Sequence, residues 1–203
     1  MARKPDPGAR ERILAAASRL FFAHGVRAVG LQQIIDACGC GKNVLYREFG
    51  SKDALVAAYL ERFARDWQIV LEEATEAAPQ DPARQLAVIV ERVAARAGGN
   101  GFRGCALSNV HAEFPDLDHP LHRYVVDHYA ARLATLRDIA RRTAARDPDA
   151  LARRISLIID GINTNAGILG GDGSLTAAVA FAREAITVAT APPQGAEGSP
   201  ASR

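Results

Sequence analysis

Hydrophobic side chains recur every three or four positions along most of the chain, a spacing typical of amphipathic helices. The first such stripe predicts a helix that ends near Gly25 and consists of Ile13, Leu14, Ala17, Leu20 and Phe21. The next stripe predicts a short helix between Gly30 and Gly39. Residues 42–49 predict a third short helix, which ends before Gly50.

Glycine, proline and capping residues divide the rest of the chain into longer helical segments. Ser51, Asp81, Asp147 and Ser174 stand where a side chain can accept a backbone N–H at the start of a helix. We expect these helices at about residues 53–78, 82–97, 104–114, 119–146, 149–169 and 174–190. Because no alternating strand of more than a few residues is found, the predicted fold class is all-α.

The composition, with 48% hydrophobic and 24% charged residues, is that of a soluble globular protein. No apolar run approaches the roughly 20 residues that span a bilayer, and the first residues are too polar for a signal peptide. Three cysteines are an odd number and too few for a disulfide framework, which favours a reducing compartment. We therefore expect a cytoplasmic protein with no membrane partner.

The formal net charge of +2 conceals a gradient along the chain. Residues 1–52 carry nine basic and four acidic side chains, a net charge of +5. The remaining residues carry 16 basic and 19 acidic side chains, a net charge of −3. This distribution points to a polyanionic partner for the first segment alone, although a charged run can also be a solvated face.

The short helices predicted between Gly30 and Gly39 and over residues 42–49 have the organisation of a helix-turn-helix. In that motif the second helix lies in the major groove of DNA. The turn between them is Cys38-Gly39-Cys40-Gly41, and Gly39 can take the positive φ that a tight turn needs. The same spacing also occurs at a corner between two helices in any helical protein. The geometry alone therefore leaves both interpretations open.

Between residues 10 and 56, a set of positions stands out, namely Arg12-Ile13-Leu14, Ala16-Ala17, Leu20-Phe21, Gly25-Val26, Leu31, Ile34, Ala37, Gly39, Lys42, Leu45-Tyr46, Phe49, Ser51-Lys52-Asp53 and Leu55. In identity and in spacing, without a gap, this set resembles the N-terminal domain of the tetracycline-repressor (TetR) family of transcriptional regulators. The resemblance implies an all-α dimer with a three-helix DNA-binding domain and a larger helical domain that binds an effector and dimerises. The expected DNA-binding domain is residues 1–52, and the expected effector and dimer domain is residues 53–191. Residues 192–203 are expected to form a disordered tail.

The resemblance also implies DNA contacts near the third helix by six residues, Lys42, Asn43, Val44, Tyr46, Arg47 and Lys52. Tyr46 and Lys52 match phosphate contacts, and Lys42 begins the helix, where its charge and the helix N-terminus favour phosphate. The other three are expected to face base edges or nearby phosphates, although Val44 can instead be a packing residue. An N-terminal arm could add phosphate contacts or stay solvated through Arg3, Lys4 and Arg10.

Some positions depart from the family pattern. Hydroxyl side chains that cap helices and touch phosphate in many members are missing at Val29, Gly30 and Gly41. Glu48 replaces a common His or Tyr, and a carboxylate near DNA is repulsive unless it accepts from cytosine or pairs with Arg47. The operator sequence therefore cannot be transferred from relatives.

Residues 101–129 resemble the C-terminal domain of a subgroup of the family through Gly104-Cys105, Asn109, Glu113-Phe114-Pro115 and Asp118-His119-Pro120. Asn109 and Glu113 share one helix face among apolar side chains, which favours a small-molecule site. Alternatively, Glu113 caps the following turn and Asn109 satisfies local backbone. Further pocket candidates, which could also be core residues, are Phe63, Trp67, Tyr124, His128 and Asn163.

Other chemistries are weaker interpretations of the same region. His111, Glu113, His119, His122 and His128 lie close in sequence, but two prolines interrupt the spacing, so we predict no metal site. A thiol switch at the cysteines of the turn is an alternative to two small buried side chains, which we expect instead. An enzyme is not expected, because the chain has no recognisable nucleophile, phosphate loop or metal motif, and we predict no catalytic residue and no cofactor.

The last two expected helices are apolar around much of their circumference, so a second copy of the chain is the expected cover. The sequence thus predicts a homodimeric repressor that leaves a pseudo-palindromic operator in double-stranded DNA when a small-molecule effector binds. A metal- or thiol-responsive regulator of the same fold is the alternative.

Overall fold

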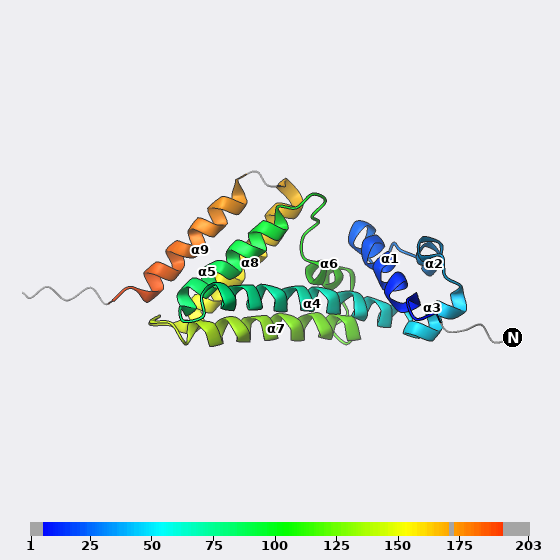
Figure 1. The fold of residues 1–203 in the computed structure, drawn as a ribbon, viewed down its shortest axis with the longest axis horizontal. Helices are drawn as coiled ribbons and strands as arrows, with labels where there is room; N and C mark the ends of the chain where they lie inside the picture. The colour runs from blue at the N-terminus through cyan, green and yellow to red at the C-terminus, as the bar shows by residue number, and fades with distance from the viewer. Residues whose placement is uncertain (1–5, 171–172, 193–203) are drawn as a thin grey trace, which may run out of the picture.

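The computed structural model describes residues 6–170 and 173–192, which form nine α-helices and no β-strand within those ranges (Figure 1). The short N-terminal helices are α1 (Ala9–His24), α2 (Leu31–Cys38) and α3 (Lys42–Phe49). The helices that follow are α4 (Lys52–Ala77), α5 (Pro82–Ala97), α6 (Ala106–Glu113), α7 (Pro120–Ala140), α8 (Pro148–Leu169) and α9 (Ser174–Thr190). The all-α prediction is confirmed. The predicted tail beyond Pro192 and the arm residues Arg3 and Lys4 lie outside the described residues.

Local sequence sets several helix ends as predicted. The side chains of Ser51, Asp81 and Asp147 each accept from the backbone N–H three residues later, at 3.0, 2.9 and 2.9 Å. At the start of α9 the predicted cap is wrong. Gly173, with a φ of 99°, occupies the N-cap position, and Ser174 is the first helical residue.

The seventh helix is shorter than its hydrophobic pattern predicts, because α7 ends at Ala140 rather than near residue 146. The Thr143 hydroxyl donates to the Ala140 carbonyl at 2.7 Å and accepts from the Ala145 N–H at 3.1 Å. These side-chain bonds compete with the helical backbone pattern and form a turn before α8.

The buried side chains form two clusters, which we call the head core and the body core. The head core joins α1, α2 and α3 to the first half of α4, to α6 and to the start of α7. The body core joins the later parts of α4 and α7 to α5, α8 and α9. In Figure 1, α4 and α7 run lengthwise between the two ends of the molecule. Helices α4, α6 and α7 therefore pack in the same core as the three short helices.

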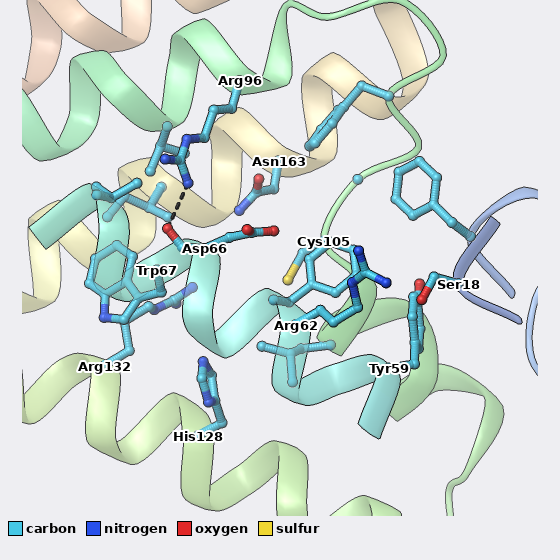
Figure 2. A pocket seen from close by; sticks show the side chains of 18 of the residues that line it. Ser18, Tyr59, Arg62, Asp66, Trp67, Arg96, Cys105, His128, Arg132 and Asn163 are labelled. Carbon is cyan, nitrogen blue, oxygen red and sulfur yellow. Dashed lines mark hydrogen bonds between the residues drawn. The ribbon is translucent and has the colours of Figure 1, made fainter. Parts of the chain in front are cut away.

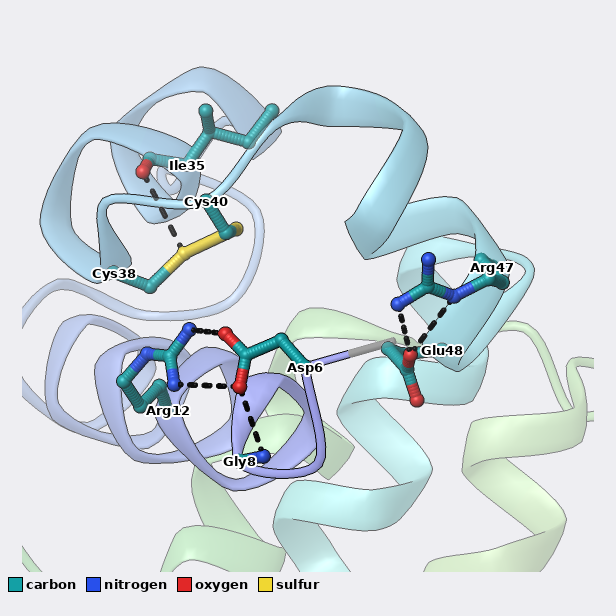
Figure 3. A network of polar contacts seen from close by, with 8 residues as sticks. All are labelled: Asp6, Gly8, Arg12, Ile35, Cys38, Cys40, Arg47 and Glu48. Carbon is teal, nitrogen blue, oxygen red and sulfur yellow. Dashed lines mark hydrogen bonds and ion pairs between the residues drawn. A yellow bond between two sulfur atoms is a disulfide. The ribbon is translucent and has the colours of Figure 1, made fainter. Parts of the chain in front are cut away.

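The cysteines of the turn differ from the expectation of two separate buried thiols. Cys38 and Cys40 form a disulfide across the turn between α2 and α3 (Figure 3). Their Cα atoms lie 5.4 Å apart because Gly39 takes a left-handed φ of 63°, and both side chains are partly exposed. The prediction of reduced, buried cysteines is wrong at these two positions, while Cys105 is free.

None of the helices in the described ranges combines the length and the hydropathy that crossing a membrane requires.

Candidate functional site

The exposed face of α3 carries four of the six residues predicted to contact DNA, namely Lys42, Asn43, Tyr46 and Arg47. The opposite face of the same helix is apolar, and Leu45 and Phe49 bury it in the head core. Burial of these two side chains determines which side of α3 faces outward. The predicted surface for DNA is therefore accessible.

Val44 and Lys52 are partly buried and differ from the four exposed residues. Val44 packs against the head core, which is the packing role that the sequence left open. Lys52 is the first residue of α4, and burial lowers the pKa of its ammonium, while the charges of Glu113 and Asp53 act in the opposite direction. Lys52 thus places a positive charge beside α3.

Two arginines of the head have intramolecular partners near this surface. Arg47 donates from Nη2 and Nε to Glu48 Oε1, at 2.8 and 3.1 Å (Figure 3). Glu48 thus takes the paired arrangement that the sequence allowed. Arg10 lies in α1 rather than in an arm; it donates to the backbone carbonyl of Glu48, and its guanidinium lies 4.3 Å from the ring centre of Phe49.

A cavity of about 700 Å³ lies where the head core and the body core meet (Figure 2). Helices α1, α4, α5, α6, α7 and α8 and the loop before α6 contribute to its wall. Its aromatic residues are Phe22, Tyr59, Phe63, Trp67 and Phe102. Its polar residues are Ser18, Arg19, Arg62, Asp66, Arg96, Cys105, His128, Arg132 and Asn163. A largely apolar hollow with a few polar groups is the usual form of a small-molecule site.

The cavity brings together four of the seven predicted ligand-binding residues, Phe63, Trp67, His128 and Asn163. The other three, Asn109, Glu113 and Tyr124, are not among the described residues that line the cavity. The ring of Tyr124 stacks beside that of His128 at a centroid distance of 6.5 Å, one turn earlier on α7.

Asn109 and Glu113 hold backbone groups on either side of α6. The Asn109 amide donates to the carbonyl of Arg103 at 3.1 Å, which is the local backbone role that the sequence left open. The Glu113 carboxylate accepts from the backbone N–H groups of Val26 and Arg27, at 2.9 and 2.6 Å. Glu113 thus caps the loop between α1 and α2 rather than the turn after α6. A ligand-binding role for these two residues stays a prediction.

Two glycines allow the loop before α6 to pass directly against α8. Gly104 has a φ of 86°, and a Cβ atom at Gly167 would lie 2.9 Å from the Gly104 nitrogen. The contact places Cys105 in the cavity wall. Gly104 was recognisable in the sequence as a motif residue, but nothing in the sequence indicated that Gly167 on α8 packs against it.

The sequence pattern also missed Arg132, which is buried in the cavity wall. Its Nη2 donates to both carboxylate oxygens of Asp160, at 2.8 and 3.0 Å, and to Ser156 Oγ at 3.1 Å. Burial and the Arg132 charge lower the pKa of His128, so its imidazole is neutral at neutral pH. The available signal was a charged residue on the apolar side of α7, between Val125 and Leu136.

The histidines do not gather at one place. The rings of His111 and His122 lie 4.7 Å apart, His119 Nε2 lies 3.7 Å from Asp53, and His128 is in the cavity. Across the described part of the chain, no group of three or more His, Cys, Asp or Glu residues is placed to hold a metal ion.

Comparison with known proteins gives a consistent result along the chain. The family model described as bacterial regulatory proteins, tetR family, matches residues 13–59. A helix-turn-helix transcriptional regulator of Mycobacterium tuberculosis is 44% identical over 57 residues, which is 28% of each chain. That match spans less than a third of the relative. The transcriptional repressor BdcR of Escherichia coli is 27% identical over 186 residues, covering 90% of this chain and 91% of BdcR.

Solved structures extend the likeness to both cores. A TetR-family transcriptional regulator from Streptomyces coelicolor superimposes with a TM-score of 0.85 and 27% identity, covering 90% of this chain and 96% of that one. A TetR transcriptional regulator from Streptomyces avermitilis is 31% identical with a TM-score of 0.69, covering 90% and 97%. These similar proteins are regulators rather than enzymes. The chain belongs to the TetR family of bacterial regulatory proteins.

Proposed function

We propose that this protein is a homodimeric transcriptional repressor that binds operator DNA through α3 and leaves it when a small molecule enters the cavity. The observation that carries the proposal is the position of the cavity. Its wall includes α1 and α4 from the head and α7 and α8 from the body, so an occupant contacts both parts. The likeness to the repressor BdcR over 90% of the chain supports repression.

The exposed face of α3 supplies the contacts to double-stranded DNA. Lys42, Tyr46 and Lys52 bind phosphates, whereas Asn43 and Arg47 face base edges in the major groove. Arg47 can exchange its contact with Glu48 for one to a guanine, because both are charge-assisted hydrogen bonds. The net charge of +5 on residues 1–52 favours this end of the molecule for DNA.

Two helices transmit ligand binding to the head. A molecule in the cavity contacts Phe63 and Trp67 on α4, which continues to Lys52 beside α3. It also contacts Cys105 and Leu107 at the start of α6, whose last residue, Glu113, holds the loop between α1 and α2. A coupling of about 1–3 kcal/mol changes DNA affinity by about 5- to 150-fold.

The dimer forms through α8 and α9. Their outer faces expose large apolar side chains within the described residues, including Leu157, Ile168, Phe181 and Val188. A second copy related by a two-fold axis covers them and sets two heads on one pseudo-palindromic operator, with half-sites about one turn, ~34 Å, or more apart. We assign residues 1–52 to the DNA-binding domain and 53–191 to the effector and dimer domain, in a protein that works in the cytoplasm.

Selection from random-sequence DNA duplexes with the purified protein tests DNA recognition. We expect an inverted repeat to be enriched. Tyr46→Phe and Lys52→Ala should weaken binding to every duplex, and Lys52→Ala should also lower the salt dependence by about one unit of the log-log slope. Arg47→Ala should instead relax the preference at one base pair, by about 1–3 kcal/mol. Arg92→Ala is the control, because Arg92 is an exposed residue of α5 that pairs with Glu73. Enrichment of no repeat, or unchanged affinity of the first two variants, would contradict the proposal.

A further inference from the structure

Two residues that line the cavity each have a buried polar atom without a hydrogen-bond partner in the described structure. These atoms are Ser18 Oγ on α1 and Arg132 Nε on α7. Figure 2 shows the two residues on opposite sides of the cavity, with Arg132 on the same side as Trp67 and His128. A buried donor without an acceptor is unfavourable, so a bound molecule that supplies the acceptor is stabilised.

Neighbouring groups hold Arg132 in one position. Its side chain is 7% exposed, and Nη2 donates to the Asp160 carboxylate and to Ser156. The guanidinium carbon lies 4.3 Å from the ring centre of Tyr129. These contacts fix the guanidinium plane and leave the Nε–H without an acceptor. A guanidinium N–H held in this way is preorganised for a planar oxyanion such as a carboxylate.

The charges around the cavity favour a negative ligand. Among the described residues that line it, four are arginines and only Asp66 is acidic. Three of these arginines pair with carboxylates that are not part of the lining, Arg62 with Glu11 at 3.1 Å, Arg96 with Glu73 at 3.9 Å and Arg132 with Asp160 at 2.8 Å. The pairs of Arg62 and Arg96 are partly exposed and cancel little of the positive potential inside the cavity, whereas Asp160 offsets the charge of the buried Arg132.

The remaining wall suits an apolar body. The Phe63 ring lies 5.2 Å from that of Tyr59 in an edge-to-face arrangement and 6.2 Å from that of Phe22 in a stacked one. Trp67 and Leu107 add apolar surface on α4 and α6. Rings and aliphatic chains bury well against such side chains.

We propose that the cavity binds an amphipathic organic acid, with its carboxylate bound by the guanidinium of Arg132 and its apolar body against Phe63 and Trp67. This inference rests on the proposed function, in which the cavity is the effector site. It adds the chemical class of the effector and the residue that recognises its charge.

Trp67 makes the test direct, because it is the single tryptophan of the chain and lines the cavity. Its fluorescence is titrated with three compounds that share a phenylbutyl body: 4-phenylbutyrate, 4-phenylbutanamide and 4-phenylbutylammonium. We expect the acid to bind about tenfold more tightly than the amide, because a charge-assisted hydrogen bond replaces a neutral one. The ammonium compound should bind most weakly of the three.

The double variant Arg132→Met, Asp160→Asn removes both members of the ion pair, so that neither charge is left buried alone. In this double variant the ratio of acid affinity to amide affinity should fall to about one, because the guanidinium that binds the carboxylate is gone. Arg92→Met is the matched control, because Arg92 pairs with Glu73 on the surface and does not line the cavity. The preference should persist in this control.

The inference is overturned if the amide binds wild-type protein as tightly as the acid, if none of the three compounds binds, or if the preference survives in the double variant. The comparison of ligands on wild-type protein keeps the test valid even if the double variant does not fold. DNA binding is measured on the same wild-type samples without ligand. If wild-type protein without ligand does not bind DNA specifically, the proposed function is contradicted. If it binds DNA but does not prefer the acid, only the inference about the ligand class is contradicted.

Discussion

At the end of α1, the backbone at Gly25 lies beside the Glu113 side chain of α6. Its φ of 85° lies in a region that residues with a Cβ rarely adopt. A Cβ atom there would also lie 3.0 Å from Glu113 Oε1, whereas the corresponding position at Gly50, with a φ of 73°, has no atom within 4 Å. The sequence marks both glycines as helix ends. Only the fold distinguishes them, because the neighbour of Gly25 comes from α6.

Gly25→Ala should lower the free energy of unfolding by about 1–2 kcal/mol through backbone strain alone. Displacement of the Glu113 carboxylate should add a coupling of about 0.5–3 kcal/mol. Denaturant unfolding of the single and double variants with Glu113→Ala measures that coupling as a double-mutant cycle. Gly50→Ala is the control, and its cost should be the same with and without Glu113. A coupling of zero between the Gly25 and Glu113 substitutions would show that their contact does not contribute to stability.

At the scale of elements, local signals predicted most helices and part of the site. Hydrophobic periodicity and caps such as Ser51 and Asp81 act within a few residues, so the sequence carries them openly. The end of α7 was not predictable from periodicity, because the side-chain bonds of Thr143 compete with a pattern that continues past it. Trp67 was recognisable as an aromatic residue on a helix that reaches both domains.

Other parts of the site depend on which helices meet, and periodicity does not specify that. Ser18 belongs to the cavity only because α1 lies against α4 and α6 closes from the side. The role of Glu113 was equally hidden, since its partners are backbone N–H groups of Val26 and Arg27, which carry no sequence signal. The motif around α6 was visible, but its function as a connection to the head required the fold.

Glu113→Gln tests α6 as that connection. The substitution keeps the shape but replaces one acceptor oxygen with an NH₂ group that faces a backbone N–H, so stability should fall by about 1–3 kcal/mol. The amides of Val26 and Arg27 should exchange faster with solvent than in wild-type protein. Hydrogen exchange resolved to the loop between α1 and α2 measures this. Glu76→Gln, on the exposed side of α4, is the control. Unchanged protection in Glu113→Gln would exclude the link.

The whole molecule separates its two proposed surfaces along its length. The basic three-helix end carries the residues for DNA, and α9 lies at the other end of the long helices (Figure 1). On α8 and α9, Leu157 is 70% and Phe181 60% exposed, which is unusual for side chains of this size. In the proposed dimer, a two-fold partner would bury this face and leave both basic ends free. The charge difference between head and body is then doubled in the assembly.

The double variant Leu157→Asp, Phe181→Asp should convert the protein to monomers, because two carboxylates on each face repel their symmetry mates and lose apolar burial. Light scattering after size-exclusion chromatography should give the mass of one chain instead of two. Operator affinity should then fall by about 10²- to 10⁴-fold, since each head binds a half-site without the effective concentration that the other provides. Val126→Asp is the control, because Val126 is an exposed apolar residue of α7 that is 50% accessible and away from α8 and α9 in sequence. A wild-type protein that runs as a monomer, or a double variant that stays dimeric with full DNA affinity, would place the dimer contact elsewhere.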